Sequence, residues 1–273
     1  MKITCLVDNA VKPSSPYWGE HGLSFLIESG NERVLFDTGT SGTVLLHNLS
    51  SAEISPKSFS ALALSHGHLD HTGGLAALLE QRPGLDIYAH PGVLRERFSR
   101  RGETLRSIGL RMEIPLLQKQ AVLHLRKEPQ EIIPGIWTTG EITARSEPEG
   151  RGEGHCIREG GNWLPDPYED DVSLVLHGVG GLVLLCGCCH AGLLNTMAHV
   201  QTTFGEYPGW IIGGTHLVAA DQQHIAYVIE RLRQMGTPKL YPNHCTGQAA
   251  YVALAKAFET HVAPCPAGTV LQL

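Results

Sequence analysis

Short apolar runs separated by turns dominate the first third of the chain and predict a series of strands. The turns between these runs contain Pro and Gly, which interrupt regular structure. We expect strands over residues 3–7, 23–28, 33–36 and 60–64, a short helix over 74–80 and a further strand over 86–90. A β-sheet therefore begins near the N-terminus.

The spacing of apolar residues changes in the second half of the chain. The run over 172–189 is broken by His177 and by glycines within 178–181, so it predicts a hairpin and not a membrane span. From Val218 onward, apolar residues recur every three or four positions, which predicts a helix that Asp221 caps. A strand over 239–241, a helix over 247–259 and a closing strand over 269–273 follow. This order is typical of two sheets packed face to face with helices outside.

Composition narrows the class of protein. The 273 residues, 42% of them hydrophobic, are enough for a sizeable core, and no stretch resembles an internal linker, so we expect one domain over 1–273. The formal net charge of -6 argues against a general nucleic-acid binder, because such proteins carry a basic excess. The expected partner is a small molecule, with neither nucleic acid nor membrane, and no particular oligomeric state is predicted. A charge interrupts the first apolar run too early for a signal-peptide core, so a cytoplasmic location is expected.

The seven cysteines, an odd number, form no plausible disulfide framework in a chain of this length, so we expect reduced thiols. Cys186, Cys188 and Cys189 crowd at the end of an expected strand. They are either small buried apolar side chains, which is the default, or ligands of a separate structural zinc. The zinc alternative lacks a second Cys pair at zinc-ribbon spacing.

Two segments stand out from this pattern. Within 91–134 lies a basic insert that contains Arg95, Arg97, Arg100, Arg101, Arg106 and Arg111. It is either a solvated helical face or a surface that attracts an anionic substrate, since Arg makes bidentate contacts to phosphate. On the second interpretation we assign Arg97, Arg100 and Arg101 to substrate binding. The segment 147–171 is rich in Gly, Pro and acidic residues and predicts a lid or a flexible surface loop.

A dense set of metal-ligand residues follows the strand over 60–64. Residues 65–74 read SHGHLDHTGG, with three histidines and a carboxylate in six consecutive positions. Imidazole and carboxylate suit zinc, iron, manganese or cobalt, and a loop at a strand end lets side chains two and four positions apart converge. His66 and His68 can therefore hold one ion while Asp70 and His71 reach a second.

The motif HxHxDH after a short apolar strand resembles the signature of the metallo-β-lactamase fold superfamily. The likeness extends to VLFDTG over 34–39, GCCHAG over 187–192, GGTHL over 213–217 and PNHCTG over 242–247. With EHGLSF over 20–25, these segments resemble the branch of the 7,8-dihydropterin-6-methyl-4-(β-D-ribofuranosyl)aminobenzene 5'-phosphate synthases. The resemblance implies an α/β (α+β) fold, an αββα sandwich of two mixed sheets flanked by helices.

The resemblance also implies a dinuclear centre. The ligand roles of the resembled superfamily, carried over to this chain, place one ion on His66, His68 and His190, and the other on Asp70, His71 and His244. His190 and His244 each follow an expected strand, which disfavours the alternative of hydrogen-bonded core histidines. The expected cofactors are two divalent ions, zinc first, with Mn²⁺, Fe²⁺ and Mg²⁺ as alternatives.

The remaining site residues are assigned from their motifs. Many superfamily members carry a bridging Asp where this chain has Cys188, and a thiolate bridge is disfavoured, so one ion is expected to bind less tightly. His216 is either a further ligand or, as we favour, a substrate-facing acid-base, catalytic together with Asp70. Asp37 is expected to orient a ligand imidazole. Glu20 and His21 are assigned to substrate binding.

Hydrolysis of a small anionic, phosphate-bearing molecule is the default reaction of such a centre. The branch resemblance implies an alternative, in which an aryl amine displaces pyrophosphate from a dihydropterin-methyl diphosphate. A di-iron redox protein is disfavoured because those relatives place Glu where this chain has His68 and carry a flavodoxin module. A non-catalytic metal-binding module is disfavoured because the ligand set is intact.

Overall fold

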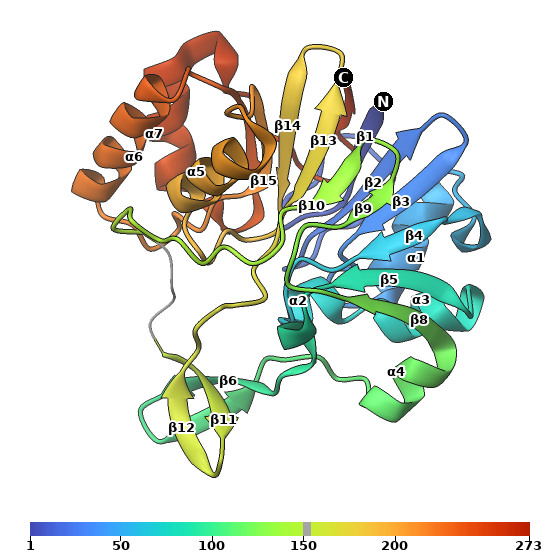
Figure 1. Cartoon of the computed structure of the whole chain (residues 1–273). Coiled ribbons are helices and arrows are strands. Elements are labelled where there is room, and N and C mark those ends of the chain that lie inside the picture. The colour runs from blue at the N-terminus through green and yellow to red at the C-terminus, as the bar shows by residue number, and fades with distance from the viewer. Residues whose placement is uncertain (150–153) are drawn as a thin grey trace.

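The structure is a computed structural model that describes residues 1–149 and 154–273. Two large β-sheets pack face to face, and helices cover the outer face of each (Figure 1). This arrangement confirms the predicted αββα sandwich. None of the helices in the described ranges is long and apolar enough to cross a membrane.

The first sheet has seven strands. In spatial order they are β17 (Val270–Gln272), β1 (Lys2–Val7), β2 (Ser24–Ser29), β3 (Glu32–Phe36), β4 (Ala61–Ala63), β5 (Leu85–Ala89) and β8 (Ala121–Leu125). From β3 to β8 neighbouring strands run parallel, whereas β17, β1, β2 and β3 pair antiparallel. The carboxyl ends of β3 and β4 therefore meet at one edge.

The second sheet has six strands. In spatial order they are β16 (Lys239–Asn243), β15 (Trp210–Gly214), β14 (Gly181–Cys186), β13 (Leu174–Gly178), β10 (Ile136–Thr138) and β9 (Glu131–Ile133). The hairpin of β13 and β14 confirms the prediction for 172–189. Because β14, β15 and β16 run parallel, their carboxyl ends also meet at one edge.

Alternation along the strands divides the core into three layers. Phe25 packs between the two sheets, and the next residue, Leu26, packs against helices outside the first sheet. Those helices are α1 (Gly42–Ser51), α3 (Leu75–Gln81) and α4 (Ile114–Gln120). Outside the second sheet lie α5 (Leu193–Phe204), α6 (Gln222–Gln234) and α7 (Gln248–Phe258). Asp221 caps α6 as expected, with its carboxylate accepting from the His224 backbone N–H at 2.7 Å.

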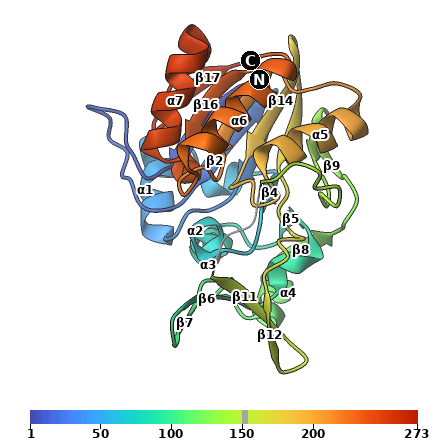
Figure 2. The same cartoon turned by 90° about the vertical axis from the view of Figure 1, so that its left-hand side faces the viewer.

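A third, smaller sheet was not expected from the sequence. It contains β12 (Asn162–Pro165), β11 (His155–Glu159), β6 (Arg97–Arg101) and β7 (Thr104–Ser107). It projects from the sandwich beside the short helix α2 (Leu69–Thr72) (Figures 1 and 2). The basic insert and the segment 147–171 thus pair through β6 and β11, although residues 150–153 of the expected lid lie outside the described residues.

Candidate metal centre

The loop after β4 brings His66 and His68 together. Both side chains are buried, and His66 Nε2 lies 3.0 Å from His68 Nδ1. His190, which follows β14, is also buried, and one donor nitrogen from each of these three histidines lies within 4.8 Å of the others. These three residues, hereafter the first donor group, come from the facing edges of both large sheets.

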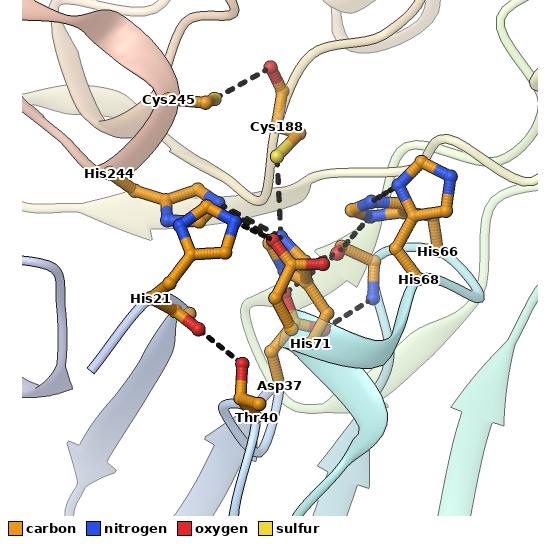
Figure 3. Close-up of polar contacts among 12 residues, drawn as sticks. His21, Asp37, Thr40, His66, His68, His71, Cys188, His244 and Cys245 are labelled. Carbon is orange, nitrogen blue, oxygen red and sulfur yellow. Dashed lines mark hydrogen bonds and ion pairs between the residues drawn. The ribbon is translucent and has the colours of Figure 1, made fainter. Parts of the chain in front are cut away.

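A second donor group, Asp70, His71 and His244, lies beside the first. His71 Nε2 is 3.3 Å from His244 Nε2 (Figure 3). His244 Nε2 is 3.4 Å from Asp70 Oδ2. The rings of His66 and His71 are 4.2 Å apart between centroids, so the two groups adjoin. The exposed His21, assigned to substrate binding from the sequence, also reaches this group, with Nε2 3.3 Å from Asp70 Oδ2.

Asp37 links the two groups. Its Oδ2 is 2.7 Å from His71 Nδ1 and accepts a hydrogen bond from Ser65 Oγ at 2.7 Å. Ser65 Oγ is in turn 2.8 Å from His66 Nδ1. The buried Asp37 carboxylate therefore turns the other nitrogen of His71, Nε2, toward the centre and orients His66 through Ser65.

The backbone is strained where these side chains leave the sheets. Asp37, His216 and His244 have positive φ angles of 60°, 54° and 47°. Such a conformation costs a non-glycine residue on the order of 1–3 kcal/mol and is concentrated at functional sites. These three residues follow β3, β15 and β16, so the strain accompanies the turn that points each strand-end residue across the edge.

His244 is held by two residues that sequence reasoning missed. Asp8 Oδ1 accepts a hydrogen bond from the His244 backbone N–H at 2.8 Å, and Asn9 Oδ1 lies 3.1 Å from His244 Nδ1. Both residues directly follow β1, so a polar pair at a strand end was the signal that could have found them.

Two further carboxylates brace the ligand loops. Asp170 Oδ2 accepts from the Gly67 backbone N–H at 2.8 Å, and Asp171 Oδ2 accepts from the Ala191 backbone N–H at 2.9 Å. Burial raises the pKa of Asp171 to about 6 despite this hydrogen bond. These residues hold the first donor group from outside.

The chemistry of the first donor group fits a metal ion. Among the described residues, His68 Nε2 and both ring nitrogens of His190 are buried without a hydrogen-bond partner. Burial lowers the pKa of His66, His68 and His190 well below the usual value, so these imidazoles are neutral, the form that binds metal. Unpaired buried nitrogens are costly, and a metal ion would satisfy them.

The second donor group carries charge. Burial alone would raise the pKa of Asp70, but His71, His21 and His244 lower it well below the usual value. Burial would lower the pKa of His71, but Asp37 and Asp70 outweigh it and raise that pKa to about 9. A metal ion at this group would therefore meet a carboxylate and would displace a proton from His71.

His216 and Glu20 occupy different surroundings. The His216 ring lies 4.3 Å from that of His190, and its Nδ1 is buried without a partner among the described residues. Glu20 Oε1 accepts from the backbone N–H groups of Thr40 and Ser41, both at 2.9 Å. The Glu20 carboxylate thus fixes the turn before α1. Glu20 also lines a cavity beside the second donor group, together with His21 and Asp70.

Cys188 lies between the donor groups, although a bridging role for its thiolate was disfavoured from the sequence. Its Sγ is 3.2 Å from His71 Nε2 (Figure 3). All seven cysteines, which lie within the described residues, are free thiols, as expected.

The position of Arg97 corrects its assignment to substrate binding. The Arg97 side chain is 1% exposed and forms ion pairs with Asp166, at 2.8 Å, and with Asp170. Arg97 instead supports the carboxylate that braces Gly67. Arg100 lies over the Trp163 ring, 5.5 Å from its centroid.

Two cavities that share Arg106 in their lining open beside the centre. One, of about 310 Å³, is lined by Arg101, Arg106 and His155 with Ser99, Thr104 and Ile108. The other, of about 300 Å³, is lined by Arg106, His21 and Asp70 with Glu20, Thr40, Leu69 and Ile108. The His155 ring is 5.1 Å from that of His68, so each cavity borders one donor group. The sequence singled out neither His155 nor Arg106 individually, because only the third sheet brings them to the centre.

Comparisons with known proteins agree with this fold. The chain is 32% identical to the 7,8-dihydropterin-6-methyl-4-(beta-D-ribofuranosyl)-aminobenzene-5'-phosphate synthase of Methanocaldococcus jannaschii, in an alignment 286 positions long that covers 100% of this chain and 96% of that protein. A solved metal-dependent hydrolase of the beta-lactamase superfamily is 27% identical, with a TM-score of 0.86 and coverage of 100% and 99%. The metallo-beta-lactamase fold protein YhfI from Bacillus subtilis shares the fold at 14% identity, with a TM-score of 0.61 and coverage of 99% and 98%. A family model for the metallo-beta-lactamase superfamily matches residues 17–244, and the chain belongs to that superfamily.

Proposed function

We propose that this protein is a metal-dependent hydrolase that acts on a small anionic, phosphate-bearing molecule at a centre of two divalent ions. The observation that carries the proposal is that two groups of potential metal ligands adjoin each other beside arginine-lined cavities. The likeness to a solved metal-dependent hydrolase over the whole chain supports hydrolysis.

His66, His68 and His190 would hold one ion, and Asp70, His71 and His244 the other. Zinc suits this set of imidazoles and a carboxylate, with Mn²⁺, Fe²⁺ and Mg²⁺ as the alternatives. Bound divalent ions supply Lewis acidity that stabilises negative charge developing on the substrate. Asp70 and His216 border the centre, and we propose that they contact the reacting group.

The arginine side chains favour an anionic substrate. Arg101 and Arg106 bring positive charge to the cavities of a protein whose formal net charge is -6. Guanidinium groups bind phosphate through paired hydrogen bonds. His155 lines the same cavity, and its ring is oriented by Tyr168, whose hydroxyl is 2.6 Å from Nδ1.

Group transfer is the second candidate, and two observations favour it. The Methanocaldococcus jannaschii relative, similar over its whole length, is a pterin-type synthase by name. A further cavity of about 490 Å³, lined in part by Val218, Tyr251 and Pro242, shares His244 with the second donor group. Its apolar and aromatic lining suits an aryl amine that would displace pyrophosphate from a dihydropterin-methyl diphosphate.

The two reactions are separated by their dependence on the amine. Metal-loaded protein is assayed with phosphodiesters, lactones and thioesters, and with a dihydropterin-methyl diphosphate in the presence and absence of an aryl amine. Hydrolysis predicts turnover without amine, and transfer predicts pyrophosphate release only with amine. Protein that retains its metal ions but turns over none of these substrate classes would contradict the proposed function.

A further inference from the structure

We propose that the thiolate of Cys188 is a metal ligand shared by the two donor groups. The inference rests on the dinuclear centre proposed above and adds to it a ligand from this chain. It replaces the expectation that Cys188 leaves the second ion weakly held.

The position of the sulfur carries the inference. Cys188 Sγ lies within 4.8 Å of donor atoms of His66 and His71, which belong to different donor groups. It is also within that distance of donor atoms of His190 and, separately, of His244. The sulfur therefore reaches both groups, and in Figure 3 it points at His71 between the histidines on either side.

The backbone before Cys188 makes this approach achievable. Gly187 packs directly on Ser65, where an added Cβ would lie 2.3 Å from Ser65 Oγ. Only glycine therefore lets the end of β14 come this close to the loop that carries His66 and His68. The next residue, Cys189, turns away, and its side chain packs in the apolar layer between the second sheet and α5 to α7.

A shared thiolate has chemical consequences for the centre. On binding a metal ion the Cys188 thiol loses its proton to solvent, and the sulfur donates electron pairs to the metal without any redox change. Thiolate is a soft ligand that favours zinc and iron over magnesium and manganese. The proposal thus also predicts that the centre discriminates against Mg²⁺ and Mn²⁺.

Cys245 is the competing sulfur. Its Sγ lies within 4.8 Å of Cys188 Sγ and of a ring nitrogen of His244. However, this sulfur accepts a hydrogen bond from the His216 backbone N–H at 3.3 Å and lies 3.5 Å from the Cys188 carbonyl oxygen. Among the described residues, Cys245 does not group with His66, His71 or His190 as a possible metal ligand. Together with its backbone contacts, this places Cys245 at the edge of the centre and not between the donor groups. We therefore assign the shared position to Cys188 alone.

The test uses the whole protein, reduced, stripped of metal and reconstituted with cobalt(II) or zinc. We expect sulfur-to-cobalt charge-transfer absorption in the near ultraviolet and, for zinc by X-ray absorption, a sulfur shell at about 2.3 Å. Cys188→Ser should abolish both signals and weaken the second metal-binding step about tenfold or more, since loss of even an outer partner of a ligand has that effect. Cys189→Ala, the matched loss of a neighbouring thiol, and Cys245→Ser should keep both signals.

The folding of each variant is checked separately from its metal binding. Cys188→Asp, which restores a charged ligand, should recover the second metal-binding step without the sulfur signals. Two bound ions with no sulfur signal in the unsubstituted protein, or a signal lost in Cys245→Ser and kept in Cys188→Ser, would overturn the assignment of Cys188 alone. Protein that binds no metal would overturn the proposed function as well.

Discussion

Asp37 is the single residue through which both donor groups are oriented. Its carboxylate contacts His71 directly and His66 through Ser65, in a position that is fully buried. A hydrogen bond to the ring nitrogen that does not face the metal sets the tautomer and basicity of a ligand histidine. The charge of one side chain therefore acts on both donor groups.

Replacing Asp37 should weaken metal binding at both sites. Asp37→Asn preserves shape but removes the charge, and we expect metal affinity to fall by about 10–100-fold, measured by competition with a chelator. Asp86→Asn is the matched control, because Asp86 Oδ1 lies 2.6 Å from His124 Nε2 in an Asp–His pair on β5 and β8, outside both donor groups. Unchanged affinity in Asp37→Asn would show that Asp37 only fills space.

Asp70 and His71, the proposed ligands, are expected to be needed for turnover. They lie on the loop and short helix after β4, outside the hydrophobic clusters. Asp70→Ala should abolish activity while circular dichroism and the unfolding midpoint of the metal-free protein change little. His71→Ala should also abolish activity, but it should lower the unfolding midpoint, because it leaves the buried Asp37 carboxylate without its ion-pair partner. Full activity with one bound ion in either variant would favour a mononuclear enzyme.

At the scale of elements, strand ends were the most informative part of the sequence. The apolar runs before His66, His190 and His244 predicted strands that the structure contains as β4, β14 and β16. Parallel strands then bring their ends to one edge of each sheet, β4 in the first sheet and β14 to β16 in the second. The hairpin over 172–189 and the helix capped by Asp221 were confirmed for the same reason, since local spacing determines both.

Nonlocal contacts account for what the sequence did not reveal. Helix α1 is the exception, because it was missed although a local signal was present: Ser41 Oγ caps it by accepting from the Val44 backbone N–H at 3.2 Å. The third sheet joins β6 to β11, which are far apart in the chain, so no local pattern predicts the pairing. The same pairing buries Arg97 against Asp166, which a local excess of arginine could not foretell.

The third sheet gives a direct prediction about substrate charge. Arg101→Gln and Arg106→Gln should each raise KM for an anionic substrate about tenfold or more, because a charge-assisted hydrogen bond contributes about 1.5–3 kcal/mol. The control is Arg158→Gln, which removes an exposed arginine that lies over Trp163, 5.8 Å from the ring centroid. If KM in all three variants equals that of the unsubstituted protein, these arginines do not bind the substrate and serve only as a solvated surface.

The start of α5 predicts a pH dependence of stability. Glu149 accepts a hydrogen bond from the Leu194 backbone N–H, and burial raises its pKa from 4.5 to about 7. The folded chain therefore holds more protons than the unfolded chain in that range, and this contribution to the unfolding free energy is lost as pH rises from 4.5 to about 7. The loss is about 3 kcal/mol at most.

Denaturant unfolding of metal-free protein below pH 4.5 and above pH 7 checks this prediction. Glu149→Gln should reduce the decline, leaving the part that the buried Asp171 carboxyl contributes with its pKa of about 6, and should increase the stability above pH 7. Glu147→Gln should keep the decline, because the Arg231 guanidinium holds the pKa of Glu147 below its usual value. A decline that persists unchanged in Glu149→Gln would assign it to another group.

At the scale of the whole molecule, the centre lies where the edges of two sheets face each other. The proposed ligand His66 comes from the first sheet and the proposed ligand His190 from the second, so an ion bound by both would join the two halves of the sandwich. Because a metal ion binds the folded chain and not the unfolded one in this way, it should stabilise the fold as well as supply the chemistry.

Anomalous X-ray scattering at the absorption edge of the bound metal tests the central claim most directly. Crystals of the protein should show two neighbouring anomalous peaks. One should lie among the nitrogens of His66, His68 and His190, and the other among the side chains of Asp70, His71 and His244. Peaks elsewhere in the molecule, or crystals of active protein with no peak at either donor group, would contradict this account.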